Sequence, residues 1–105
     1  MLTTWYVQLP TGDKANREAV KHVAEVPLGA DMVGIAIKDD GLPYAYFDCD
    51  TEKPLVPHTF FISGTGYNNE IMRGEVIKRV GMFQYPDEVA DELWIWHVWH
   101  KPYGH

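Results

Sequence analysis

The chain has 105 residues, of which 46% are apolar and 23% are charged, so its length and composition predict one globular domain over residues 1–105. The formal net charge of −6 argues against a general affinity for nucleic acid or anionic lipid. With a single cysteine, no signal-peptide pattern and no run of about 18 apolar residues, we expect a reduced cytosolic compartment and no membrane span.

Apolar and polar residues alternate with a period of two along most of the chain, which is typical of β-strands. Val33, Ile35 and Ile37 are expected on one face of a strand, and Asp-Gly at 40–41 predicts a hairpin to the next strand. Pro43 lacks an amide proton, so it belongs at the first residue of that strand or on a sheet edge. The pattern predicts seven strands, at residues 4–9, 20–26, 32–38, 43–49, 57–63, 75–84 and 92–100.

Two segments combine helical and other signals. Asp13–Val26 has alanines and valines at near-helical spacing, but its last part is also typical of a strand, so we expect a loop or helical turn and then a strand. Pro86–Asp91 begins with proline and acidic residues, which predicts one helical turn between the last two strands. Gly81, inside the sixth predicted strand, indicates a β-bulge.

The last predicted strand contains three of the four tryptophans and is apolar on both faces. One face carries Trp94, Trp96, Val98 and His100, and the other carries Leu93, Ile95, His97 and Trp99. Such a strand is either central in its sheet or meets another subunit or a ligand. We therefore expect a homo-oligomer with its interface on the first of these faces. The fold class is predicted to be all-β, a small antiparallel sandwich or partly open barrel with short helical turns in its loops.

A glycine-rich turn after the fifth predicted strand is the best candidate for a ligand-binding loop. Its backbone N–H groups could bind an anion, and its tyrosine could stack on a ring. It matches neither the P-loop motif nor the dinucleotide-binding motif, and the competing interpretation is a simple turn that uses the positive φ of a glycine. The candidate ligand-binding residues are Ser63, Gly64, Thr65, Gly66, Tyr67 and Arg73.

We expect no catalytic residue, no metal and no cofactor. His97 and His100 are three residues apart on a strand, so they point to opposite faces and cannot chelate one metal. The alternating acidic residues within 48–52 resemble a cation loop but precede Lys-Pro, which favours a solvated turn. Cys49 lies between two aspartates that disfavour a thiolate. A hydrolase using His58 or His97 with a carboxylate is an alternative that no spacing supports.

The order of several short motifs resembles a family of small, uncharacterised bacteriophage proteins. Its members carry P-x-G-A, G-x-P, G-T-G, G-x-F-Q and W-H-V-W motifs in this order. The matching segments here are Pro27–Ala30, Gly41–Pro43, Gly64–Gly66, Gly81–Gln84 and Trp96–Trp99. This chain differs by longer segments at 13–21, 68–74 and 86–91, where a function of its own could lie. The resemblance transfers no catalytic residue.

The resemblance implies a phage gene product in the host bacterial cytoplasm. By analogy with small phage proteins that act by binding, we expect a non-enzymatic protein that antagonises a bacterial anti-phage defence system. Its partner would be a host defence protein, blocked through an acidic surface, or a small nucleotide immune signal, held in an aromatic pocket. The net charge of −6 favours the first version. The alternative is a virion or structural accessory protein.

Overall fold

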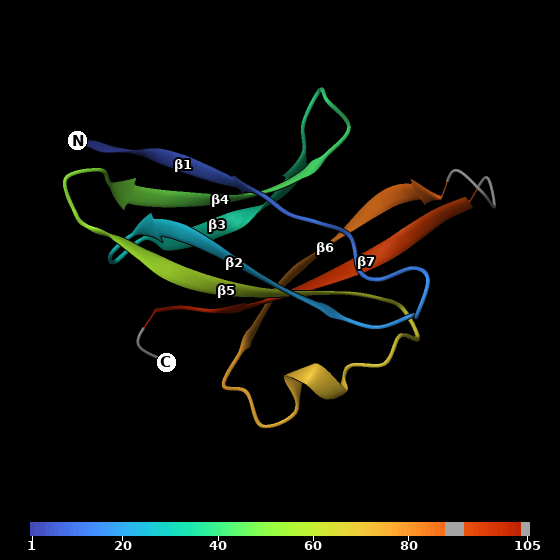
Figure 1. Ribbon diagram of the computed structural model, residues 1–105. Coiled ribbons are helices and arrows are strands. Elements are labelled where there is room, and N and C mark those ends of the chain that lie inside the picture. The colour runs from blue at the N-terminus through green and yellow to red at the C-terminus, as the bar shows by residue number, and fades with distance from the viewer. Residues whose placement is uncertain (88–91, 104–105) are drawn as a thin grey trace.

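The computed structural model describes residues 1–87 and 92–103, and there the chain has the predicted all-β fold (Figure 1). Its elements are β1 (Leu2–Gln8), β2 (Val20–Pro27), β3 (Asp31–Ile37), β4 (Pro43–Asp50), β5 (Leu55–Gly64), the 3-10 helix η1 (Glu70–Met72), β6 (Lys78–Asp87) and β7 (Glu92–Lys101). Within these described ranges, no helix is long and apolar enough to cross a membrane.

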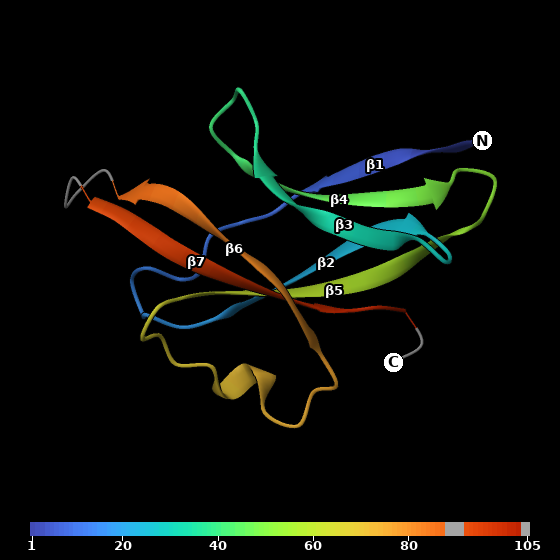
Figure 2. The ribbon, with the colours of Figure 1, turned by 180° about the vertical axis from the view of Figure 1, so that it is seen from behind.

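The seven strands form two antiparallel sheets that do not close into a barrel, consistent with the predicted sandwich or open barrel. One sheet has the strand order β1-β4-β3 and the other has the order β2-β5-β7-β6. The edge strands β3 and β6 approach each other, which joins the sheets along one seam. In both ribbon views, β1 and β4 lie on one side of β5 and the loop with η1 lies on the other side (Figures 1 and 2).

The predicted Asp-Gly hairpin connects β3 and β4. Gly41 has a φ of +81°, and its N–H donates to the carbonyl oxygen of Lys38 at 2.9 Å. A residue with a Cβ would be strained in this left-handed conformation, which explains the glycine. Pro43 is the first residue of β4, as predicted, so the ladder of this central strand is not interrupted by its missing N–H.

A β-bulge in β3 overturns the prediction that Val33, Ile35 and Ile37 share a face. The pairing with β4 shifts register between Met32 and Gly34, which leaves Val33 as the extra residue. Met32 and Ile35 pack against the core, whereas Val33 is 63% exposed. A single inserted residue changes the face on which its neighbours lie, because side chains alternate with a period of two.

The tryptophan-rich strand β7 lies between β5 and β6. Trp96 and Val98 are fully buried, His100 is only 5% exposed, and Trp94 packs against the same core. These four residues were expected at an oligomer interface, but they form part of the core of the chain itself. The opposite sheet and neighbouring loops supply the apolar cover that was expected from a second subunit.

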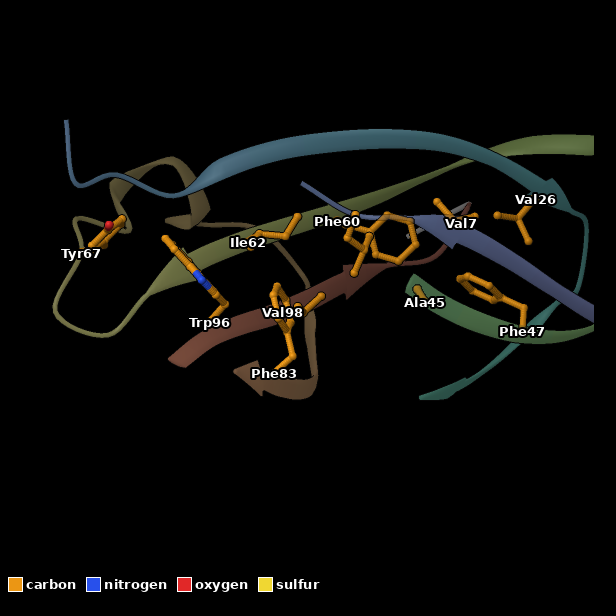
Figure 3. Packing of buried hydrophobic residues seen from close by; sticks show 11 residues of the cluster. Val7, Val26, Ala45, Phe47, Phe60, Ile62, Tyr67, Phe83, Trp96 and Val98 are labelled. Atoms are coloured by element: carbon orange, nitrogen blue, oxygen red, sulfur yellow. The ribbon is translucent and has the colours of Figure 1, made fainter. Parts of the chain in front are cut away.

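The core runs from the space between the sheets to the far half of β7 (Figure 3). Its buried cluster is formed by Val7, Leu9, Val26, Ala45, Phe47, Phe60, Ile62, Tyr67, Phe83, Trp96 and Val98. At the Trp96 end, two loops close over the indole ring. A Cβ at Gly12 would lie 2.8 Å from the ring of Trp96, and one at Gly64 would lie 2.9 Å from the ring of Tyr67. Only glycine allows this approach without displacing the rings.

The ambiguous segment before β2 forms a tight loop rather than a helix. Asp13 and Glu18 exchange backbone hydrogen bonds of 3.0 and 3.2 Å, and the chain then enters β2 at Val20 as expected. The loop after β5 contains η1, which no local sequence pattern predicted.

Strand β6 is shifted relative to its prediction. It begins at Lys78 rather than at 75, and a register shift between Arg79 and Gly81 confirms the predicted bulge. Pro86 and Asp87 belong to β6 and not to a helical turn. The rest of that predicted turn, 88–91, lies outside the described residues.

Candidate functional site

The predicted ligand loop is a β-turn, and two of its backbone donors bond within the chain. The N–H of Tyr67 donates to the carbonyl oxygen of Gly64 at 3.1 Å, and Gly66 has a φ of +83°, as in a type II turn. The N–H of Thr65 donates to the carbonyl oxygen of Ile95 at 3.3 Å. Two of the N–H groups that could have bound an anion are therefore engaged within the chain.

Ser63 and Arg73, the ends of the predicted ligand site, are also engaged. Ser63 is fully buried and its hydroxyl lies 2.5 Å from Oδ1 of Asn69. Arg73 forms two hydrogen bonds of 2.7 Å with the carboxylate of Glu70, which raises the pKa of the guanidinium. These residues therefore stabilise the loop around η1 rather than converge on a ligand.

The cation that lies at Tyr67 is Arg17. Its guanidinium carbon is 5.8 Å from the ring centroid of Tyr67 and 5.9 Å from that of Trp94. Arg17 has a φ of +55°, a conformation uncommon for residues other than glycine. Nothing in the local sequence marks Arg17, because the contact joins the loop before β2 to a turn far along the chain.

His97 lies in a hydrogen-bonded chain on the outer face of the four-stranded sheet. Nδ1 of His97 accepts from Arg79, because a guanidinium can only donate. Nε2 therefore carries the proton and donates to Oγ1 of Thr65 at 2.7 Å. Partial burial, and secondly the charge of Arg79, lower the pKa of His97. In this tautomer His97 cannot take a proton from Thr65, so the arrangement does not activate a nucleophile.

His58 and His100 form a buried pair between the sheets. Nδ1 of His58 lies 2.9 Å from Nε2 of His100, and the ring planes differ by 9° with centroids 5.1 Å apart. The rings are nearly parallel, and the 2.9 Å between the two nitrogens accounts for more than half of the distance between the ring centroids. The two rings therefore meet edge to edge through a hydrogen bond. The rings of Phe47 and Phe60 flank His100 at 5.6 and 5.0 Å. Burial, and secondly His58, lower the pKa of His100 to about 4, and burial also lowers that of His58.

The acidic residues that were expected in one solvated turn are divided between two elements: Asp48 and Asp50 end β4, and only Glu52 lies in the turn that follows. Asp50 accepts hydrogen bonds from the N–H of Glu52 at 3.0 Å and from the amino group of Met1 at 3.1 Å, which lower its pKa in that order. Cys49 is a buried free thiol. In the part of the chain that the structure describes, no group of three or more His, Cys, Asp or Glu residues is placed to hold a metal ion.

Three tyrosines on the outer face of the three-stranded sheet form a surface that was not predicted from the sequence. Tyr6 of β1 is paired in register with Tyr46 of β4, and its ring centroid lies 5.5 Å from that of Tyr44 and 6.3 Å from that of Tyr46. Tyr6 is 55% exposed and Tyr46 is partly exposed, whereas Tyr44 is only 7% exposed and supports the other two rings. We call Tyr6, Tyr44 and Tyr46 the tyrosine face. Tyrosine is enriched in protein interfaces because it offers a large, rigid, amphipathic contact.

The hairpin between β3 and β4 holds the tyrosine face in place. Nζ of Lys38 lies 4.1 Å from the ring centroid of Tyr6 and 4.6 Å from that of Tyr44. The hydroxyl of Tyr44 donates to Asp40 at 2.5 Å, which raises the pKa of Tyr44 to about 12 and lowers that of Asp40. The rings are thus ordered before any partner binds, which reduces the entropy lost on association.

Negative charge is concentrated around the tyrosine face. Residues 31–53 contain six acidic side chains and two lysines, a net charge of −4, and residues 1–10 have no charged side chain. Asp31 and Asp48 are directly opposite each other in the β3–β4 register. Like charges in such a pair disfavour folding, so nothing in the local sheet explains their placement.

Neither a protein-family model, nor a curated protein, nor a solved structure matches this chain.

Proposed function

We propose that this chain is a non-enzymatic binding protein that uses the tyrosine face to occupy a basic groove of a partner protein. The observation that carries the proposal is the contact of three ordered tyrosines from two segments, 1–10 and 31–53, whose side chains together carry a net charge of −4. Tyrosine rings supply contact area, while the surrounding carboxylates attract a cationic surface and accelerate its association.

The proposed partner is a protein whose groove otherwise holds nucleic acid. Asp31 and Asp48 place two carboxylates side by side, and Asp40 adds a third at the hairpin end of the same sheet. This arrangement resembles the dense negative charge that a nucleic-acid-binding groove recognises. Occupying the groove blocks it, so inhibition requires no chemical step by this chain.

The resemblance to small bacteriophage proteins supplies the biological context of this proposal. In that context the partner is a host defence protein in the bacterial cytoplasm, and its inhibition favours the phage. The alternative version, sequestration of a nucleotide signal at the glycine-rich turn, has less geometric support because Tyr67 is buried and Arg73 is paired with Glu70.

Co-purification tests the proposal with three forms of the tagged protein, expressed in a bacterium that carries assorted defence systems. The forms are the wild type, the double variant Tyr6→Ala/Tyr46→Ala and the control Met82→Ala. Met82 is 58% exposed and lies on β6 of the other sheet, so Met82→Ala also removes a large exposed side chain but leaves the tyrosine face intact. Circular dichroism and urea unfolding establish that all three forms are folded.

We expect the wild type and Met82→Ala to capture a nucleic-acid-binding protein that the double variant loses. With the purified partner, this chain should compete with nucleic acid, and its affinity should fall severalfold when ionic strength rises from about 0.05 to 0.3 M. Equal capture by all three forms, or an affinity that does not respond to salt, would show that the tyrosine face is not the binding surface.

A further inference from the structure

A cleft of about 340 Å³ opens on the seam between the two sheets, where β3 and β6 begin. Small-molecule sites typically occupy roughly 300–1,000 Å³, so the cleft suits a small ligand. Its walls combine apolar side chains with charged or polar side chains in similar measure. The residues that the argument uses are Met32, Val80, Pro102, Asp31, Lys78 and His100.

His100 provides a buried polar group in the wall of the cleft. Its side chain is only 5% exposed, yet it is one of the lining residues. Nε2 of His100 is hydrogen-bonded to Nδ1 of His58, so Nδ1 of His100 is the ring nitrogen that remains for a ligand. When His58 donates in this pair, Nδ1 of His100 carries the proton and is a donor. An anion in the cleft stabilises this tautomer.

Lys78 provides the positive charge of the cleft. It is paired in register with His100, so both side chains leave the sheet on the same face. None of the ion pairs in the described ranges involves Lys78. The next residue, Arg79, also lines the cleft, but its guanidinium carbon lies 5.0 Å from the ring centroid of Trp99.

Asp31 on the β3 wall carries the opposing charge and forms no ion pair with Lys78 within the described residues. The cleft is therefore asymmetric, with donors on the β6 and β7 side and an acceptor on the β3 side. A ligand that satisfies both sides has an anionic end at Lys78 and a hydrogen-bond donor at its other end.

We propose that this cleft binds a small molecule through a carboxylate or a phosphate-like oxyanion, held by the ammonium group of Lys78 and by Nδ1 of His100. The site uses none of the three tyrosines of the tyrosine face, but Asp31 borders both, because it is paired with Asp48 and also lines the cleft. Its occupant would lie on the seam between the sheets, in contact with Met32 and Val80.

NMR titration of the whole protein tests this site with two probes, acetate for a carboxylate and sulfate for a tetrahedral oxyanion. Ionic strength is held constant with potassium chloride, because screening alone changes exposed charges. We expect saturable shifts of the His100 ring and the Val80 methyl signals. Lys78→Gln should weaken binding about fivefold to tenfold. Lys21→Gln removes an exposed lysine of the same sheet that does not line the cleft, and should leave binding unchanged.

Sulfate also tests the role of His100, because its charge is constant between pH 5.5 and 7.5. Bound sulfate favours the imidazolium, so affinity should increase toward pH 5.5 in the wild type. The other titratable and charged groups that face His100 are Lys78 and Asp31 of the cleft lining and His58, its hydrogen-bond partner. Saturation by either probe supports the site and indicates whether carboxylates or phosphate-like groups are preferred. Linear shifts with both probes, or equal affinities of Lys78→Gln and Lys21→Gln, would overturn it.

Discussion

Nδ1 of His58 and Nε2 of His100 lie 2.9 Å apart in the interior between the two sheets, where aromatic rings replace water as neighbours. This relationship makes the stability of the fold depend on pH. The unfolded imidazoles take up a proton near pH 6.5, whereas the folded pKa of His100 is about 4. The unfolded state therefore binds more protons between these values.

We expect full stability above pH 6.5 and a loss of about 2–3 kcal/mol as the pH falls from 6.5 toward 4. Urea unfolding at intervals between pH 7.5 and 5 measures the part of this loss that histidines cause, since unfolded carboxylates protonate mainly below about pH 5. The variant His100→Phe should show a shallower dependence in that window. A flat unfolding free energy in the wild type would contradict the burial of the pair.

Gly12 and Gly64 should be intolerant of a methyl group. A Cβ at either position would lie under 3 Å from a buried aromatic ring that neighbouring loops hold in place. We expect Gly12→Ala and Gly64→Ala each to lower the free energy of unfolding by about 1–3 kcal/mol. Gly34→Ala is the matched control, because no atom lies within 4 Å of its added Cβ, and it should change stability by less than about 0.5 kcal/mol.

Arg79→Gln should raise the pKa of His97 toward its ordinary value. The substitution removes the positive charge that opposes protonation, while the amide of glutamine can still donate to Nδ1. The pKa is measured from the imidazole resonances of His97 in an NMR titration. Arg73→Gln removes a cation that is paired with Glu70 and should leave this titration unchanged. Identical His97 curves in the wild type and Arg79→Gln would contradict the contact.

Asp31→Asn should stabilise the fold and weaken partner binding at the same time. The substitution removes one member of the like-charged pair with Asp48, so the midpoint of urea unfolding should increase. It also removes a carboxylate beside the tyrosine face, so association with the basic partner should slow, most clearly at low salt. A lower midpoint would mean that the pair is not repulsive in the folded chain.

Local sequence patterns were sufficient to predict most of the fold. The period of two located all seven strands, and the Asp-Gly pair and Pro43 defined the central hairpin, because turn chemistry and strand alternation depend on neighbours in sequence. The bulge in β3 could not be predicted from the same patterns, since one extra residue leaves the composition of the strand unchanged. The sequence showed that β7 needed cover on its inner face but not that the chain provides it.

The candidate sites were harder to predict because they depend on contacts between distant segments. Tyr44 and Tyr46 are two residues apart, a local sign that they share a face, but only strand pairing brings Tyr6 beside them. The same holds for Arg17, which reaches Tyr67 across two loops. For the glycine-rich turn that was predicted as a binding loop, the sequence did not show that Tyr67 packs against Trp96 or that Ser63 bonds Asn69.

The buried position of Cys49 gives the protein an intrinsic reporter of its own motions. This residue is the only cysteine and lies in β4, the middle strand of the sheet that carries the tyrosine face. Only 8% of Cys49 is exposed, so transient opening of that sheet should accelerate the attack of a disulfide reagent on the sulfur, and the labelling rate in native buffer responds to that opening. A bound partner that clamps the sheet would slow the reaction, which allows occupancy to be followed by chemical kinetics without any added probe.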